Sequence, residues 1–175
     1  MTKHPYKLDQ VAIRMVKERP LLSEEPLSSP DAVVRVMNNL LKDYDREVFA
    51  VVNLQSDLKP INMNIVSVGT LNASITHPRE VLKSVILSNA ASVVLIHNHP
   101  SGSLRPSQED ISVTGKLMEV LNMLDVKLLD HVILGTGDRY YSFSERAVMP
   151  VVSDRTWRTE HEINVKGQKK LSYER

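Results

Sequence analysis

The sequence predicts one α/β domain in which helices flank a mixed β-sheet. Between residues 29 and 150, segments with helical apolar spacing alternate with short β-rich segments in the order αββαβαββα. Residues 92–97 form a continuous apolar run of strand length, which is typical of a central strand covered on both faces. We therefore expect a domain at 29–150, preceded by an N-terminal extension at 1–28 and followed by a polar C-terminal tail at 151–175.

The first half of the domain is expected to begin with a helix at 30–43. Ser29 suits the N-cap, and Pro30 and Asp31 suit the first turn of that helix. A β-rich run at 47–54 and an alternating polar and apolar run at 62–68 then predict two strands that pair with each other. Within the N-terminal extension, apolar residues between 8 and 16 recur at helical spacing and predict a short amphipathic helix.

The second half of the domain continues the alternation of helices and strands. Its expected elements are a helix at 78–88, a strand at 92–97, a loop at 98–106, a helix at 107–124, strands at 126–134 and 140–143, and a short helix from Ser144 to Pro150. The last two strands are separated by a glycine-containing turn at 135–138.

Composition excludes several classes of function. The net charge of +1 does not provide the concentrated basic field that nucleic-acid binding uses, although local basic patches remain compatible with it. Cysteine is absent, so disulfides, thiolate metal sites and cysteine nucleophiles are excluded, and a reducing, cytoplasmic setting fits. No apolar run approaches the roughly 20 residues of a membrane span, so no membrane partner is expected.

The most informative residues are His97, His99 and Asp110. The two histidines are two residues apart at the end of the apolar strand, so their imidazoles should project to the same side. A Pro-Ser-Gly loop then turns the chain and delivers Asp110 in the first turn of the next helix. Two histidines and one carboxylate would be a catalytic zinc ligand set that leaves one position open for water.

Such a site also needs groups that are not metal ligands. Glu47 begins a strand that can neighbour the His97 strand, so it is our candidate acid/base for moving a proton from water to a leaving amine. Ser107 could hydrogen-bond the water or an oxyanion.

Each of these features also has an ordinary structural interpretation. Ser107 and Asp110 have the spacing of a helix capping box, and Glu47 could be a solvated charge at the edge of a strand. His131 could be a hydrogen-bonded histidine of a buried strand or a second group near the metal. Taken by residue chemistry alone, the metal site and these structural roles stay open as alternatives.

The spacing of these residues resembles a known signature. His97, His99, Ser107 and Asp110 match the H-x-H, seven residues, S, two residues, D pattern of the JAB/MPN (JAMM) metalloprotease superfamily. The longer run from His97 to Asp110, together with His77-Pro78-Arg79-Glu80 and Leu129-Asp130-His131, resembles the bacterial RadC branch.

This resemblance implies a fold, a cofactor and roles for the site residues. The fold would be a cytidine-deaminase-like α/β sandwich. A Zn²⁺ ion would be held by His97, His99 and Asp110, with Glu47 as acid/base and Ser107 supporting the tetrahedral intermediate. The chain also departs from RadC-type proteins, because residues 1–28 are too short for their amino-terminal helix-hairpin-helix region.

The sequence therefore predicts a zinc-dependent hydrolase that cleaves amide or isopeptide bonds with a zinc-activated water. Its partner would be a peptide or a protein conjugate. The alternatives are a DNA repair-associated or nucleic-acid-processing protein of the RadC type, and an interaction module that performs no chemistry.

Overall fold

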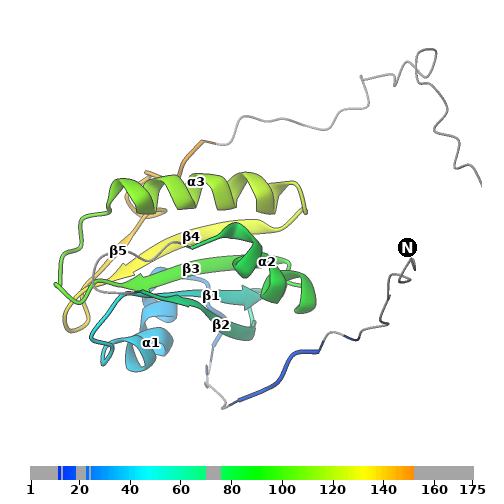
Figure 1. Ribbon diagram of the computed structural model, residues 1–175, viewed down its shortest axis with the longest axis horizontal. Coiled ribbons are helices and arrows are strands. Elements are labelled where there is room, and N and C mark those ends of the chain that lie inside the picture. The colour runs from blue at the N-terminus through cyan, green and yellow to red at the C-terminus, as the bar shows by residue number, and fades with distance from the viewer. Residues whose placement is uncertain (1–11, 13, 19–22, 24, 70–75, 152–175) are drawn as a thin grey trace, which may run out of the picture.

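The computed structural model describes residues 12, 14–18, 23, 25–69 and 76–151. It contains a five-stranded sheet flanked by three helices (Figure 1). The elements in chain order are α1 (Pro30–Leu41), β1 (Val48–Leu54), β2 (Pro60–Val68), α2 (Pro78–Leu87), β3 (Ser92–Asn98), α3 (Gln108–Asn122), β4 (Lys127–Leu134) and β5 (Tyr140–Ser142). The predicted α/β class and the eight elements predicted between residues 30 and 143 are confirmed.

The sheet is mixed, with strand order β2-β1-β3-β4-β5. β1 runs antiparallel to both β2 and β3, and β5 runs antiparallel to β4. β3 and β4 form the parallel pair, and α3 connects them. Residues that follow the carboxyl end of β3 therefore lie beside the amino-terminal end of α3, where ligand sites of α/β sheets commonly form.

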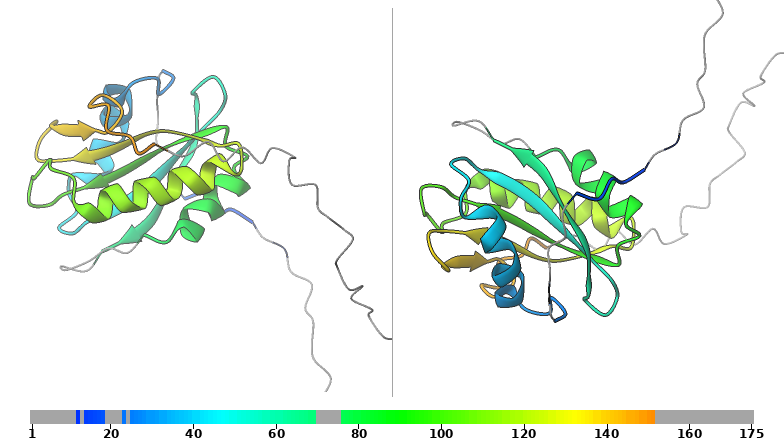
Figure 2. Two further views of the ribbon diagram at one scale, coloured as in Figure 1. Left: turned by 90° about the horizontal axis from the view of Figure 1, so that it is seen from above. Right: turned by 90° about the horizontal axis from the view of Figure 1, so that it is seen from below.

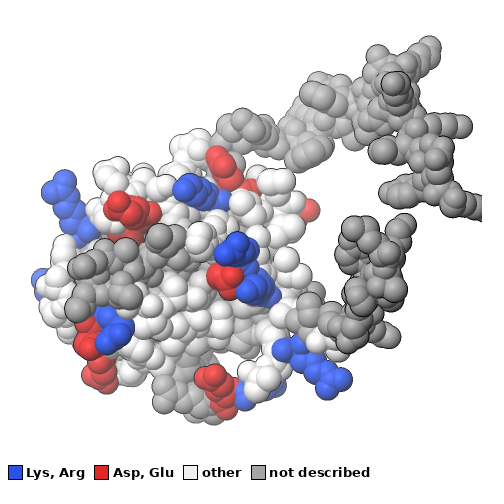
Figure 3. Space-filling model, in the orientation of Figure 1, with Lys and Arg blue, Asp and Glu red and all other residues white. Residues whose placement is uncertain are grey.

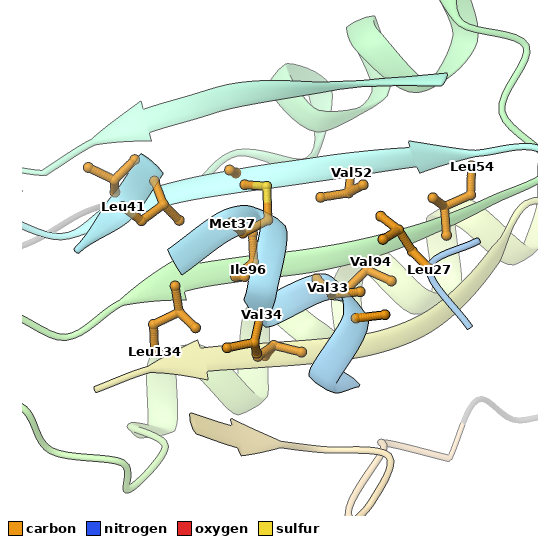
Figure 4. Close-up of a cluster of buried hydrophobic side chains, with 14 residues drawn as sticks. Leu27, Val33, Val34, Met37, Leu41, Val52, Leu54, Val94, Ile96 and Leu134 are labelled. Atoms are coloured by element: carbon orange, nitrogen blue, oxygen red, sulfur yellow. The ribbon is translucent and has the colours of Figure 1, made fainter. Parts of the chain in front are cut away.

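Two apolar clusters fill the space between the sheet and its helices. α1 covers one face, and α2 and α3 cover the other (Figures 1 and 2). Against α1, side chains such as Met37 pack on Val52, Ile96 and Leu134 of three neighbouring strands (Figure 4). Against α2 and α3, Val93 and Leu95 of β3 belong to the second cluster. β3 is buried along its whole length, as expected for a central strand.

Two predicted helices are wrong or lie partly outside the described residues. Residues 12 and 14–18 have no helical structure, and Met15 and Val16 are exposed; the rest of 8–16 lies outside the described residues. Residues 143–147 form turns in place of the short helix expected from Ser144. Ala147 has a positive φ of 55°, so the chain cannot propagate a helix there.

Of the helices in the described part of the chain, none combines the length and the apolar character required to cross a membrane.

Candidate metal centre

The carboxyl end of β3 brings the two histidines together. Backbone alternation places His97 on the same face of the sheet as Leu95, facing α2 and α3. His99 follows the strand, and its amide N–H donates to the Leu134 carbonyl of β4 over 2.8 Å. The Nε2 atoms of His97 and His99 lie 2.9 Å apart. The two imidazoles thus meet, as the spacing of two residues leads one to expect.

A tight turn after His99 directs the chain toward α3. The Gly102 N–H donates to the His99 carbonyl over 2.9 Å, and Gly102 has a φ of 73°. A Cβ atom at this position would lie 2.9 Å from Thr136 Cγ2, so a larger residue would be both strained and crowded. The requirement for glycine therefore comes from the turn and from its close approach to the β4–β5 connection.

The amino-terminal turn of α3 supplies Asp110. Ser107 is the N-cap, and its Oγ accepts the Asp110 N–H over 3.1 Å. The Ser107 N–H and hydroxyl each donate to Asp110 Oδ2 over 2.7 Å, which completes a capping box. Asp110 Oδ1 lies 3.3 Å from His97 Nε2, and Oδ2 lies 3.7 Å from His99 Nε2. Capping and membership of the cluster are thus compatible roles for the same carboxylate.

The three side chains present a set of electron pairs to one point. One potential ligand atom from each of His97, His99 and Asp110 lies within 4.8 Å of the other two. His99 Nδ1 is 2.7 Å from the Ser103 carbonyl, which can only accept, so this nitrogen carries the proton. A neutral His99 therefore turns the lone pair of Nε2 toward the cluster. Such a donor set fits a divalent cation that accepts nitrogen and oxygen ligands.

Two of the three groups are already deprotonated at neutral pH, which favours cation binding. Burial lowers the pKa of His97 to about 4, an effect that the Asp110 charge only partly opposes. Burial alone would raise the pKa of Asp110, but hydrogen bonds from His99 and Ser107 and the charge of His97 hold it well below its ordinary value. The hydrogen bond to Asp110 raises the pKa of His99. His99 is thus the group whose proton competes with a cation near neutral pH.

Glu47 lies at the entrance of β1, which is the strand beside β3. Phe49 pairs with His97 in the antiparallel register, so Glu47 precedes β1 at the end of the sheet that carries the cluster. Its side chain is exposed, and its charge contributes to the raised pKa of His99. Glu47 is therefore within electrostatic range of the cluster without belonging to the three-residue group.

The backbone around Glu47 is held by Asn98, the buried last residue of β3. Asn98 Oδ1 accepts the Val48 N–H over 2.8 Å, and Asn98 Nδ2 donates to the Arg46 carbonyl over 3.1 Å. The Glu47 carbonyl itself accepts the Gly69 N–H over 2.7 Å. These bonds fix the chain on both sides of Glu47, which limits the positions that its carboxylate can reach.

A second group of polar side chains lies behind His97. His131 of β4 has no solvent exposure, and its Nε2 lies 2.9 Å from His97 Nδ1. Its Nδ1 lies 2.6 Å from Thr114 Oγ1 of α3. The sequence left His131 open between a core histidine and a group near the metal, and it gave no indication of Thr114 or Asn98. Each of the three is defined by partners far away in the chain.

Comparison with known proteins places these residues in a family. The family model described as "RadC-like JAB domain" matches residues 27–148. An UPF0758 protein of Methanosarcina mazei is 44% identical over 125 residues, which is 70% of this chain and 54% of that protein. An UPF0758 protein of Rubrobacter xylanophilus is 45% identical over 123 residues, or 70% of this chain and 53% of that protein.

The chain spans about half the length of these curated relatives. The match to the family model nevertheless includes all the elements from α1 to β5 and every residue of the candidate metal centre. The resemblance inferred from the H-x-H, S and D spacing is confirmed at the level of the family. The chain belongs to the RadC-like JAB domain family.

Proposed function

We propose that this protein is a zinc-dependent hydrolase that cleaves amide or isopeptide bonds. The observation that carries the proposal is the convergence of His97, His99 and Asp110, a three-ligand set with a carboxylate, Glu47, nearby that is not a ligand. Two histidines and one carboxylate are a ligand set of catalytic zinc sites, which keep a further position for water or substrate. The family supports a JAB-type domain, and the zinc chemistry is our inference from the donor set.

The chemistry divides between the metal and the protein. A zinc ion at this site would supply a Lewis acid that polarises a carbonyl and lowers the pKa of a bound water toward about 7. Glu47 would accept the proton of the attacking water and return it to the leaving amine. The hydrogen bonds between the Asn98 side chain and the backbone of Arg46 and Val48 would hold the Glu47 carboxylate at a fixed distance from the reacting atoms.

Ser107 has a constrained role in this scheme. Its hydroxyl proton is directed to Asp110 Oδ2, so its first contribution is to orient that carboxylate. We propose that it also donates to the developing oxyanion, which requires the hydroxyl to rotate away from Asp110. Ser107→Ala should therefore lower both zinc affinity and turnover, because both the orienting bond and the oxyanion donor are lost.

The alternative of phosphodiester cleavage has less support. Most metal-dependent phosphodiesterases use two ions, whereas the described residues contain one group that could hold a metal. On the face shown in Figure 3, basic and acidic side chains are interspersed, and they form no continuous basic surface. We therefore assign the amide bond, in a peptide or in a side-chain conjugate, as the substrate class.

The test is cleavage of a library of peptides and lysine-linked conjugates by the full chain. The expected result is cleavage that a chelator abolishes and that one equivalent of zinc restores. Glu47→Gln should bind zinc normally and lose roughly 10²- to 10⁴-fold in rate, since it keeps the size of the side chain and removes the base.

Glu109→Gln is the matched control, because Glu109 is an exposed acid of α3, next to Asp110 in the chain, that is not part of the cluster. It should cleave at the rate of the original protein. Cleavage that survives complete zinc removal, or that Glu47→Gln leaves unchanged, would contradict the proposed mechanism. Absence of any cleavage by the zinc-loaded protein across both substrate classes would contradict the amide assignment.

A further inference from the structure

His131 is a polar side chain that the proposed chemistry does not use, although it touches the metal centre. It lies in β4 beside β3 and is completely buried. Phe143 stacks on its ring with centroids 5.0 Å apart, and Phe49 meets it edge-on at 5.5 Å. An imidazole in such apolar surroundings is costly unless both ring nitrogens are hydrogen-bonded. The partners of the two nitrogens therefore determine what this side chain can do.

Both partners of His131 lead to proposed metal ligands. On one side, His131 Nε2 lies 2.9 Å from Nδ1 of His97. On the other side, His131 Nδ1 lies 2.6 Å from Thr114 Oγ1, and that hydroxyl lies 2.5 Å from the backbone carbonyl of Asp110. The contacts thus begin at His97 on β3 and return to Asp110 on α3. They connect two proposed ligands that come from different elements.

The donor and acceptor of each hydrogen bond in this series follow from the Asp110 carbonyl at one end of it. The Asp110 carbonyl can only accept, so the single hydroxyl proton of Thr114 is donated to it. The Thr114 oxygen must then accept, and His131 Nδ1 must be the nitrogen that carries a proton. The ring is fully buried against Phe49 and Phe143, where a charged imidazolium would be costly, so it is neutral and its Nε2 is an acceptor.

The acceptor nitrogen of His131 determines the tautomer of His97. Since His131 Nε2 accepts, His97 Nδ1 must donate, and a neutral His97 then has its lone pair on Nε2. That nitrogen is the one that lies 2.9 Å from His99 Nε2 and 3.3 Å from Asp110 Oδ1. The opposite tautomer would place two lone pairs between His97 and His131 and a proton where a cation would bind.

We propose that Thr114 and His131 form a relay that fixes the tautomer of His97, so that its Nε2 lone pair is permanently available for a metal ion. Thr114 and His131 are thus positioning residues, which act on the metal through His97. The functional role of this relay rests on the proposed metal centre. Its hydrogen-bond directions are a property of the metal-free protein and can be measured there.

The test is histidine tautomer assignment by long-range ¹H–¹⁵N correlation in the full chain, labelled at histidine and freed of metal with chelator. In the original protein, His97 and His131 should both show the Nδ1–H pattern. Thr114→Val keeps the shape of the side chain and removes the hydroxyl. The Nδ1–H of His131 then has no oxygen acceptor at this position, so the Nδ1–H tautomer is no longer favoured. We expect the Nε2–H form of His131 and His97 to become populated in this variant. Thr114→Ser should restore the original pattern.

Zinc affinity supplies a second readout that does not depend on activity. Loss of a partner behind a metal-bound histidine typically costs 10- to 100-fold in affinity, and we expect a loss in this range for Thr114→Val by competition with a chromogenic chelator. Thr114→Ser should stay within about threefold of the original protein, because it retains the donor and the acceptor of the hydroxyl.

The outcomes separate the relay from the proposed function. An Nε2–H tautomer of His97 in the original protein would overturn the relay, and so would a Thr114→Val protein with unchanged tautomers and unchanged zinc affinity. Failure of the original protein to bind zinc, with both tautomers as expected, would instead overturn the proposed function and leave the hydrogen-bond relay standing.

Discussion

The two faces of β3 begin alike and end differently. Toward α1, the strand presents Val94 and Ile96, and toward α2 and α3 it presents Val93 and Leu95. All four side chains are buried in apolar clusters. The faces diverge at the carboxyl end of β3, where His97 joins the candidate metal centre and Asn98 forms hydrogen bonds with the backbone of Arg46 and Val48.

This difference shows how a polar site can be built as the continuation of a core. The apolar residues fix the strand by burial, and the polar residues that follow are fixed by hydrogen bonds to neighbouring elements. If this division is correct, substitutions on the α1 face should change stability without changing zinc affinity. Substitutions at the carboxyl end of β3 and at the start of α3 should change zinc affinity more than stability, with Asn98 at the boundary.

The largest expected effect on the polar side is that of Asp110→Asn. The substitution preserves size but removes the negative charge that faces both histidines. Because it alters a ligand itself, zinc affinity should fall by more than the roughly 100-fold that loss of an outer-shell partner can cost. Chelator competition measures this change, with Glu109→Gln as the control that binds normally. Retention of affinity within threefold would remove Asp110 from the ligand set.

The matching change on the apolar side is Met37→Ala in α1. Met37 is 1% exposed and packs in the cluster between α1 and the sheet (Figure 4). Truncation should lower the free energy of unfolding by about 2–5 kcal/mol, as large-to-small core substitutions do. Urea denaturation measures this effect. Zinc affinity of the folded variant should stay within twofold, and a large loss of affinity would show that the two faces are not independent.

Asn98→Ala tests the boundary between the two regions. It leaves the buried Val48 N–H without its acceptor, so we expect a loss of about 1–3 kcal/mol in unfolding free energy. It also frees the chain around Glu47, and turnover should fall further than the zinc occupancy does. Asn64→Ala, at an exposed position of β2, is the control for loss of an asparagine side chain. Equal turnover per bound zinc in the two variants would argue against a positioning role for Asn98.

The smallest expected effect is the dependence of zinc affinity on pH. Between pH 5.5 and 6.5, His97, with a pKa of about 4, and Asp110, with its lowered pKa, are already deprotonated. His99 has a raised pKa and must release its proton before it can bind the ion. Affinity should therefore rise about tenfold over this pH unit as the pH increases. A hundredfold rise would mean that both histidines lose protons, contrary to the burial of His97.

Local patterns were sufficient to predict most of the fold. Apolar spacing, the N-cap at Ser29 and the proline at residue 78 each act within a few residues, and the corresponding helices form as expected. The turn at residues 143–147 was not predictable in this way. It ends at Ala147, whose φ of 55° does not allow a helix to continue, and its Ser144 N–H donates to the Asp130 carboxylate, 14 residues away in the chain. The residues next to Ser144 in the sequence do not predict that contact.

The same distinction applies to the candidate metal centre. His97, His99 and Asp110 could be selected from the sequence because the H-x-H spacing and the capping box are local patterns, and the structure brings the three side chains together. Thr114 and Asn98 were not identified, since Thr114 meets His131 across 17 residues and Asn98 meets Val48 across 50 residues of chain. Their roles depend on the pairing of β3 with β1 and β4, which no local pattern specifies.

The most direct test of the metal centre is anomalous diffraction at the zinc edge from crystals of the zinc-loaded full chain. We predict one peak per chain, at about 2.0–2.2 Å from His97 Nε2, His99 Nε2 and a carboxylate oxygen of Asp110. A peak bound elsewhere, or no peak in crystals in which these three side chains point away from one another, would contradict the account.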